Sequence, residues 1–299
     1  MKRRLSLLLI AVLLLTAIPG VAHADIGPKP SIDISFSGLE GETYFVCLLG
    51  RVENEGYLYP LTLAKAMEEG YHTWLPEAEL QSFLQYKDSD GFVPLHDGEE
   101  CSTSHHFRLS RFPPGEFKVL IYFPKTGNFV ESDRIYDNYA FNSYYRIDAT
   151  RSGLTSDSSG EMNLQLQNGY VYLGAIASFL VRLVITLAIE ISIAWAFKLR
   201  EKRVLKLIVL VNVITQTLLT FVLSWVDFFS GSLASILLYI LLETLVFLIE
   251  AIIYSVRANR ISAVPIPHWK LWLFSWVANT VSFFAGLLLL TSAMMLMIA

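Results

Sequence analysis

The sequence predicts a multi-domain membrane protein: an extracytoplasmic β-rich domain, of immunoglobulin-like sandwich type, followed by an all-α bundle of four transmembrane helices. An apolar run behind N-terminal bases indicates export, and four long apolar stretches in the C-terminal half indicate membrane insertion. The charges agree, because residues 25–169 hold 22 Asp/Glu against 11 Lys/Arg, whereas residues 170–299 hold only 5 against 9. The bases do not cluster on a soluble face, which argues against a nucleic-acid partner.

Residues 1–24 form a predicted signal peptide. Bases occupy positions 2–4, the apolar run covers residues 5–18, and Ala22-His23-Ala24 supplies a small-residue cleavage site. The mature chain is therefore expected to begin at Asp25, with an uncleaved anchor helix as the alternative. Either reading places the following domain outside the cytoplasm.

Residues 25–149 form the expected extracytoplasmic domain. Residues 115–123 follow a Pro-Pro-Gly turn and are the clearest strand, with Phe117, Val119, Ile121 and Phe123 on one face. Further strands are expected at 31–36, 43–49 and 139–147, and a short helix at 77–86. Turn-bounded strands at this spacing are typical of a β-sandwich.

A linker is expected at residues 150–169, which are rich in Ser, Gly and Asn. The chain has two cysteines, Cys47 and Cys101, and both belong to the exported part. A disulfide suits that compartment, while two buried thiols in an apolar sheet are the alternative.

Residues 170–299 hold the four predicted spans, at about 171–197, 205–226, 233–256 and 271–298. Basic residues flank the connection between the first two spans and the connection between the last two, whereas the middle connection has Asp227 and no base. The positive-inside rule places both basic connections in the cytoplasm of a multi-pass plasma-membrane protein. The signal peptide independently predicts the same orientation, with the lipid bilayer as the bundle's surroundings.

Seven polar side chains interrupt the apolar spans, and they are the candidate site. They are Arg182, Glu190, Asn212, Gln216, Glu243, Glu250 and Asn279. Counting depth at 1.5 Å per residue places Arg182 level with Glu243 and predicts an ion pair between them. Glu190, Asn212, Glu250 and Asn279 form a predicted inner layer. Gln216 lies between this inner layer and the outer layer of Arg182 and Glu243.

Two readings of this polar stripe are open. Carboxylates at one depth cannot both stay ionised cheaply, so a proton or a shared cation is expected on the functional reading. A hydrogen-bond network that fixes helix register is the structural reading. A bundle of only four helices would need oligomerisation or a partner to transport a substrate.

The exported part offers two weaker candidates. Asp88-Ser89-Asp90-Gly91 resembles part of a calcium loop, with Asp97 at its end, but Tyr86 would occupy the first ligand position and an Asp-Gly turn is the favoured interpretation. His96, His105 and His106 lie near Glu99 and Glu100, although adjacent histidines on a strand point to opposite faces. We therefore predict no metal site and no cofactor.

Familiar catalytic motifs are absent from the sequence. All six histidines lie outside the predicted spans, no Asp lies within one, and neither a P-loop nor a G-x-S-x-G turn occurs. This pattern favours a non-enzymatic role.

Several segments resemble uncharacterised membrane proteins of Gram-positive bacteria that carry a signal peptide, an extracytoplasmic β-rich domain and a C-terminal helical membrane domain. The segments are 86–92 (YKDSDGF), 113–124 (PPGEFKVLIYFP), 139–145 (YAFNSYY) and 212–216 (NVITQ), with Glu243 and Glu250. The resemblance implies a bacterial plasma membrane and carries no activity.

Two functions fit these features. The first is a membrane-anchored surface protein whose exported domain binds a ligand or a partner protein while the bundle anchors it or relays the binding. The second is a transporter or channel component that uses the intramembrane polar stripe.

Overall fold

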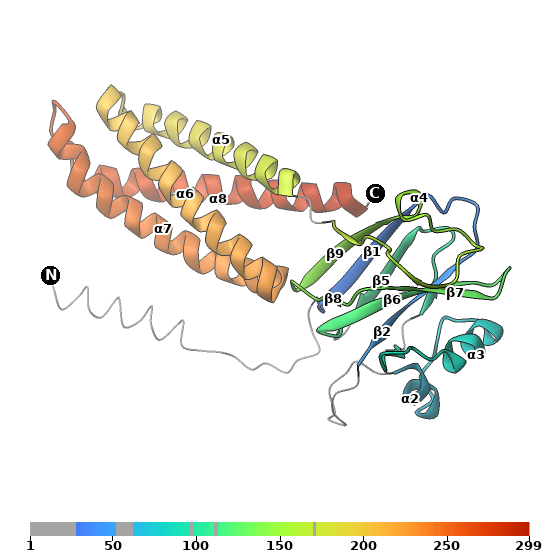
Figure 1. The fold of residues 1–299 in the computed structure, drawn as a ribbon. Helices are drawn as coiled ribbons and strands as arrows, with labels where there is room; N and C mark the ends of the chain where they lie inside the picture. Colours follow the sequence, from blue (N-terminus) through green and yellow to red (C-terminus); the bar gives the residue numbers. More distant parts are fainter. Residues whose placement is uncertain (1–27, 52–61, 96–97, 111–112, 170–171, 299) are drawn as a thin grey trace.

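The fold is that of a computed structural model, which describes residues 28–51, 62–95, 98–110, 113–169 and 172–298 (Figure 1). The predicted signal peptide lies outside the described residues, and so do His96 and Asp97. The N-terminal region is β-rich, and the C-terminal region is helical. The coarse architecture predicted from the sequence is therefore confirmed.

Two β-sheets build the N-terminal region. One has the strand order β11-β9-β1-β5, and the other has the order β10-β7-β6-β2-β3, with β4 beside β2 and β8 beside β6. Most neighbours are antiparallel, but β1 pairs with β9 and β7 pairs with β10 in parallel. The strands are β1 (Ser31–Ser37), β2 (Phe45–Gly50), β3 (Val93–Pro94), β4 (Glu99–Glu100), β5 (His106–Ser110), β6 (Glu116–Phe123), β7 (Asn128–Ser132), β8 (Tyr136–Asp137), β9 (Asn142–Asp148), β10 (Gly160–Met162) and β11 (Gln167–Asn168).

The seven-stranded sheet, which contains β2 and β6, is buried on both faces. Alternate side chains of β6, from Phe117 to Phe123, fill the core between the two sheets. The opposite face packs under the helices α2 (Leu63–Glu68) and α3 (Glu77–Gln85), which lie outside the sheet in Figure 1. Burial on both faces explains why β2 is an unbroken apolar run.

The two cysteines occupy opposite faces of this sheet. Cys47 of β2 packs in the cluster beneath α3, whereas Cys101 packs in the core between the sheets. Both are buried thiols, so the disulfide alternative is not formed in the structure. The reason is the strand periodicity, which directs Cys47 away from the inter-sheet core.

The expected linker at 150–169 is part of the exported domain. It contributes α4 (Ala149–Ser152), β10 on the edge of one sheet and β11 on the edge of the other. Leu154 and Leu164 are buried in the main core. The polar composition concealed this, because short edge strands need few apolar residues to be held in place.

Four helices form the C-terminal region: α5 (Tyr172–Ala196), α6 (Lys202–Ser230), α7 (Ser232–Ile261) and α8 (His268–Ile298). They pack as a ring in which α5 contacts α6 and α8, and α7 contacts α6 and α8. Among the described residues α5, α6 and α7 are long and apolar enough to cross a membrane. A crossing by α8 remains a prediction.

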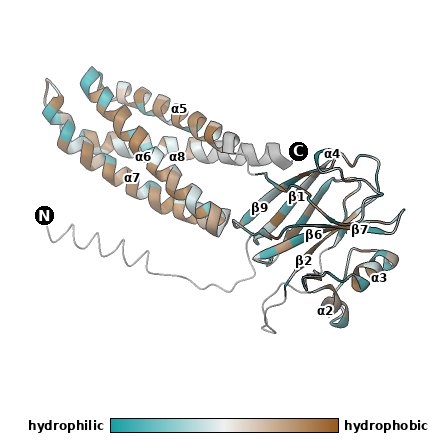
Figure 2. Ribbon diagram, in the orientation of Figure 1, coloured by the Kyte–Doolittle hydropathy of each residue, from teal (hydrophilic) through white to brown (hydrophobic). Residues whose placement is uncertain are grey.

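The helices of the bundle are rich in apolar residues, which Figure 2 shows as brown ribbon, and many of these residues are exposed. Leu218, Phe221, Ile240 and Ile252 are among the large apolar side chains exposed there. Such a surface indicates contact with membrane lipid.

The β-rich domain, for which export is predicted, contacts the bundle directly. The Phe141 N–H donates a hydrogen bond of 2.8 Å to the Phe228 carbonyl near the end of α6, and the Tyr139 and Phe228 rings lie 6.1 Å apart. The residue between α6 and α7 is Gly231, with φ +81°, and a Cβ atom there would lie 2.5 Å from the Phe141 ring. We call this contact the domain seat. It fits only a residue without a side chain.

Candidate functional site

Four of the predicted site residues meet in the centre of the bundle, one from each helix. Glu190 of α5, Asn212 of α6, Glu250 of α7 and Asn279 of α8 are all buried. The Asn212 amide donates to Glu190 Oε2, and the Asn279 amide donates to Glu250 Oε2 at 2.8 Å. We call these four residues the inner cluster.

Hydroxyl groups that the sequence analysis did not single out complete the inner cluster. Thr215 Oγ1 donates to Glu250 Oε1 at 2.7 Å, and the Asn212 amide also donates to the Tyr254 hydroxyl at 3.1 Å. Residues with a hydroxyl group are common in apolar helices, so the presence of a Thr or Tyr does not by itself identify a site residue. The usable signal was spacing, because Tyr254 lies four residues after Glu250 and therefore on the same helix face.

Three acceptor atoms of the inner cluster have no hydrogen-bond donor among the described residues. They are Glu190 Oε1, Asn212 Oδ1 and Asn279 Oδ1. Each side chain already uses its other polar atom: Glu190 accepts from Asn212, and each amide nitrogen donates to a carboxylate. Buried acceptors without donors are costly, by roughly 1–3 kcal/mol each. The inner cluster therefore has capacity for a positively charged or donating group.

The outer layer differs from the prediction. The Arg182 guanidinium donates to Thr220 Oγ1 of α6, while Glu243 has Tyr239 and Gln216 as polar neighbours. The predicted ion pair between Arg182 and Glu243 is wrong, since no such pair within 4.0 Å occurs among the described residues. Helices α5 and α7 are diagonal in the ring, so residues at one depth on these two helices need not touch.

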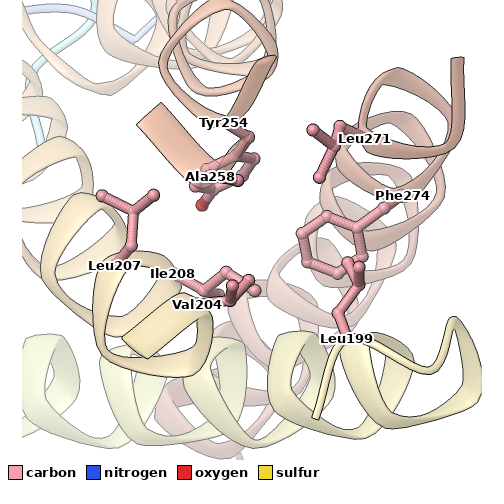
Figure 3. Close-up of a pocket in the computed structure, with 8 residues that line it drawn as sticks. All are labelled: Leu199, Val204, Leu207, Ile208, Tyr254, Ala258, Leu271 and Phe274. Atoms are coloured by element: carbon pink, nitrogen blue, oxygen red, sulfur yellow. The ribbon is translucent and has the colours of Figure 1, made fainter. Parts of the chain in front are cut away.

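An apolar layer closes one end of the bundle. Figure 3 shows a pocket there lined by Leu199, Val204, Leu207, Ile208, Tyr254, Ala258, Leu271 and Phe274. Its only side-chain polar atom is the Tyr254 hydroxyl, which bonds to Asn212. The inner cluster therefore borders apolar packing on the side of the basic connections and polar residues on the side of the exported domain.

The exported domain holds a second buried charged group. Lys118 of β6 is 2% exposed, and its ammonium lies 2.7 Å from Asp88 and 2.8 Å from Asp90. Glu131 lies 3.3 Å away and accepts from the Tyr86 hydroxyl. The sequence 88–91 therefore folds around a lysine. Asp88 also accepts backbone N–H groups of Asp90 and Phe92, as in an Asp-type turn.

The histidines of the weighed metal site have separate partners. The His105 ring lies 3.1 Å from the Tyr44 hydroxyl, and His106 lies 3.3 Å from Asp33. In the part of the chain that the structure describes, no three His, Cys, Asp or Glu side chains gather to hold a metal ion.

The chain was compared with protein-family models, curated proteins and solved structures, and none of them matches. The inner cluster combines two buried carboxylates, two amides and three acceptors without donors, which is the strongest chemical feature of the described residues.

Proposed function

We propose that this protein is a membrane-anchored surface protein whose exported domain binds an extracytoplasmic partner and whose helical bundle relays that binding. The domain seat is the observation that carries this proposal, because a simple anchor needs only a flexible tether. Here β11 is followed by α5 after three residues, and Phe141 contacts the junction of α6 and α7. A displacement of the domain would act on three helices at once.

The relay reaches the inner cluster through the same helices. Helix α6 carries Asn212 and ends at the domain seat, and helix α7 begins there and carries Glu250. A shift of the α6–α7 junction therefore changes the distances on which the Thr215–Glu250 hydrogen bond depends. Rigid helices transmit such shifts when the packing has two discrete arrangements.

The partner surface that we favour is an aromatic turn ahead of α3. Trp74 is 77% exposed, and its ring packs edge-on against His72 at 5.1 Å. Tyr71 is also exposed. Exposed Trp and Tyr are enriched at binding hot spots, since they supply a large area with few rotatable bonds.

The partner surface can be tested by photo-crosslinking in intact cells. A photoreactive amino acid at position 74 is expected to give a discrete adduct, whereas the same residue at the exposed position 135, on the turn before β8, is expected to give none. Equal adducts from both positions, or none from position 74, would contradict the proposed partner surface.

The remaining parts of the proposal concern topology. Removal of the signal peptide, four membrane crossings and an immunoglobulin-like use of the sandwich all fit an exported binding module. Basic residues flank the connections at 197–201 and 262–267 and support a cytoplasmic position for that end of the bundle. They are Lys198, Arg200, Lys202, Arg203, Arg257, Arg260 and Lys270.

A second candidate function is that of a transporter or channel component. The inner cluster favours it, because ionisable groups within membrane segments commonly mark ion or substrate paths. The two candidates differ in one respect. Transport requires the carboxylates of the inner cluster, whereas partner binding by the exported domain does not.

A further inference from the structure

The bundle consists of two similar helix hairpins, α5–α6 and α7–α8. Each hairpin has a glutamate on its first helix and an asparagine on its second: Glu190 with Asn212, and Glu250 with Asn279. A hydroxyl residue follows each asparagine by three positions, Thr215 in one hairpin and Ser282 in the other. All six side chains are buried.

The two hairpins also share their hydrogen bonds. Each asparagine amide donates to the carboxylate of its own hairpin and to the carbonyl four residues earlier, at 3.1 Å for Asn212 and 3.0 Å for Asn279. Each hydroxyl oxygen also lies within hydrogen-bond distance of the backbone carbonyl of that asparagine, at 3.2 Å for Thr215 and 3.1 Å for Ser282. Three matching interactions in two hairpins indicate a structural repeat.

The packing of the helices agrees with this repeat. Exchanging α5 with α7 and α6 with α8 leaves the ring of contacts unchanged, because every helix touches both of its neighbours. Both hairpins also run in the same sense through the membrane. Parallel repeats of this kind place their ligand sites at the interface between the repeats, near the middle of the bilayer.

One interaction breaks the correspondence. Thr215 Oγ1 donates across the hairpin interface to Glu250 Oε1 at 2.7 Å. The equivalent bond would run from Ser282 to Glu190, but among the described residues the Ser282 hydroxyl bonds only to the Asn279 backbone carbonyl. Glu190 Oε1 is consequently an acceptor without a donor, in a side chain with no exposed surface.

We infer that the inner cluster is a binding site for one small hard cation, either a proton or a sodium-sized metal ion, with Glu190 Oε1 as its primary ligand. The inference deepens the second candidate function and rests on it. The two amide oxygens without donors, one on each hairpin, supply further ligands from opposite sides of the repeat interface.

The chemistry of the inner cluster selects this class of ligand. Its available ligand atoms are oxygens, which suit hard cations and not the soft metals that prefer sulfur or imidazole. The charged or titratable groups that face Glu190 are Glu250, Glu243 and Tyr254, and none of them supplies a positive charge. Arg182 lies two turns away on α5 and bonds to Thr220.

Polar residues flank the inner cluster on one side only. Gln216, Glu243 and Tyr239 lie between it and the end of the bundle that carries the exported domain. The opposite end is closed by the apolar pocket of Figure 3. A cation would therefore enter from the side of the exported domain.

The site can be tested with a hydrophobic carbodiimide, which adds covalently to protonated carboxylic acids in apolar surroundings. The full-length protein in detergent is labelled between pH 5 and pH 9 in choline, potassium or sodium chloride at constant ionic strength. Peptide mass spectrometry then locates the adduct. We expect labelling at Glu190 that falls as the pH rises. If a metal ion binds, sodium slows labelling about tenfold once its concentration exceeds its dissociation constant by about that factor.

Two variants sharpen this test. Glu201→Gln removes a carboxylate at the opposite end of the bundle, where it accepts from Ser262, and should leave labelling of Glu190 within a factor of two to three. Asn279→Ala removes a proposed ligand oxygen and should weaken sodium protection, or shift the pH dependence, by about tenfold. The unmodified protein gives the main result, so the test does not depend on a variant that folds.

Each outcome decides the inference. Labelling that depends on pH alone identifies a proton site, and protection by sodium identifies a metal-ion site. Absence of labelling at Glu190, or labelling unaffected by pH and cations, overturns the inference and leaves a structural network. If a cation binds but no cation flux is measured in proteoliposomes, the binding site is supported and the transport function is contradicted.

Discussion

Lys118 shows how a buried charge decides the conformation of a loop. Burial alone would lower the pKa of Lys118, but hydrogen bonds to Asp88 and Asp90 outweigh it and hold the pKa above its ordinary value. Burial likewise tends to raise the pKa of Asp88, but hydrogen bonds from Lys118 and from the Phe92 N–H hold it below its ordinary value. The lysine thus fixes the 88–91 turn against β6.

Replacing this lysine should destabilise the exported domain. Lys118→Met leaves Asp88, Asp90 and Glu131 close together without a cation, and we expect a loss of about 3 kcal/mol at pH 7. The loss should shrink toward pH 4, because the carboxylates then take up protons. Hydrogen–deuterium exchange of β6 in the full-length protein measures it. The control is Lys125→Met, a lysine that is 60% exposed, with an expected change below about 0.5 kcal/mol.

The pH dependence of the unmodified domain follows from the same groups. The raised pKa of Lys118 means that its stabilisation is complete below the unfolded value of about 10.4 and is lost as the pH rises through the folded value. The lowered pKa of Asp88 gives stabilisation that is present above about pH 4 and is lost as the pH falls through its folded value. Burial raises the pKa of Glu131, so proton uptake there offsets part of the loss in acid. A stability plateau between about pH 5 and pH 10 follows.

At the scale of elements, the α6–α7 junction joins the two regions of the molecule. Helix α6 ends at Ser230 and α7 begins at Ser232, so Gly231 alone makes the turn. Its backbone (φ +81°, ψ 171°) is essentially restricted to glycine. The Phe141 ring occupies the space that a side chain would need.

Gly231→Ala should therefore release the exported domain from its seat. The backbone strain costs about 1–3 kcal/mol, and the Phe141 ring must also move. We expect faster hydrogen exchange at the Phe141 amide and at the adjoining ends of α6 and α7. The matched control is Gly127→Ala, which has φ +73° but no atom within 4 Å of the added Cβ. Equal acceleration of hydrogen exchange by Gly231→Ala and Gly127→Ala would show that the effect comes from backbone strain alone and not from the contact with Phe141.

At the scale of the whole molecule, hydropathy and charge agree on the orientation. Both basic connections belong to one end of the bundle, and the exported domain packs on the other end. The positive-inside rule then predicts that the domain lies outside the cytoplasm. The signal peptide gives the same orientation by an independent argument.

Cysteine accessibility tests this orientation. The thiols of Cys47 and Cys101 are buried, and burial also raises the pKa of Cys101, so they should not react with a membrane-impermeant maleimide in the native protein. Trp74→Cys should be labelled in intact cells. Val264→Cys, on the exposed connection between α7 and α8, should be labelled only after permeabilisation. The opposite pattern would reverse the predicted topology.

The sequence by itself determined the depth of each polar residue along its helix. Depth depends only on the rise per residue and the position of the span, so the inner layer of Glu190, Asn212, Glu250 and Asn279 could be predicted. The strand β6 could likewise be predicted, because its β-branched and aromatic residues follow a Pro-Pro-Gly turn that is visible in the sequence itself.

Only the tertiary structure decided which residues at one depth touch. Arg182 and Glu243 share a level, but their helices are diagonal in the ring, and nothing local in the sequence encodes the order of helices around it. The same reason applies to the cysteines, which the sheet separates onto opposite faces, and to β10 and β11, which are held by partners far away in the chain. Depth and alternation are properties of one segment, whereas neighbours are properties of the assembled fold.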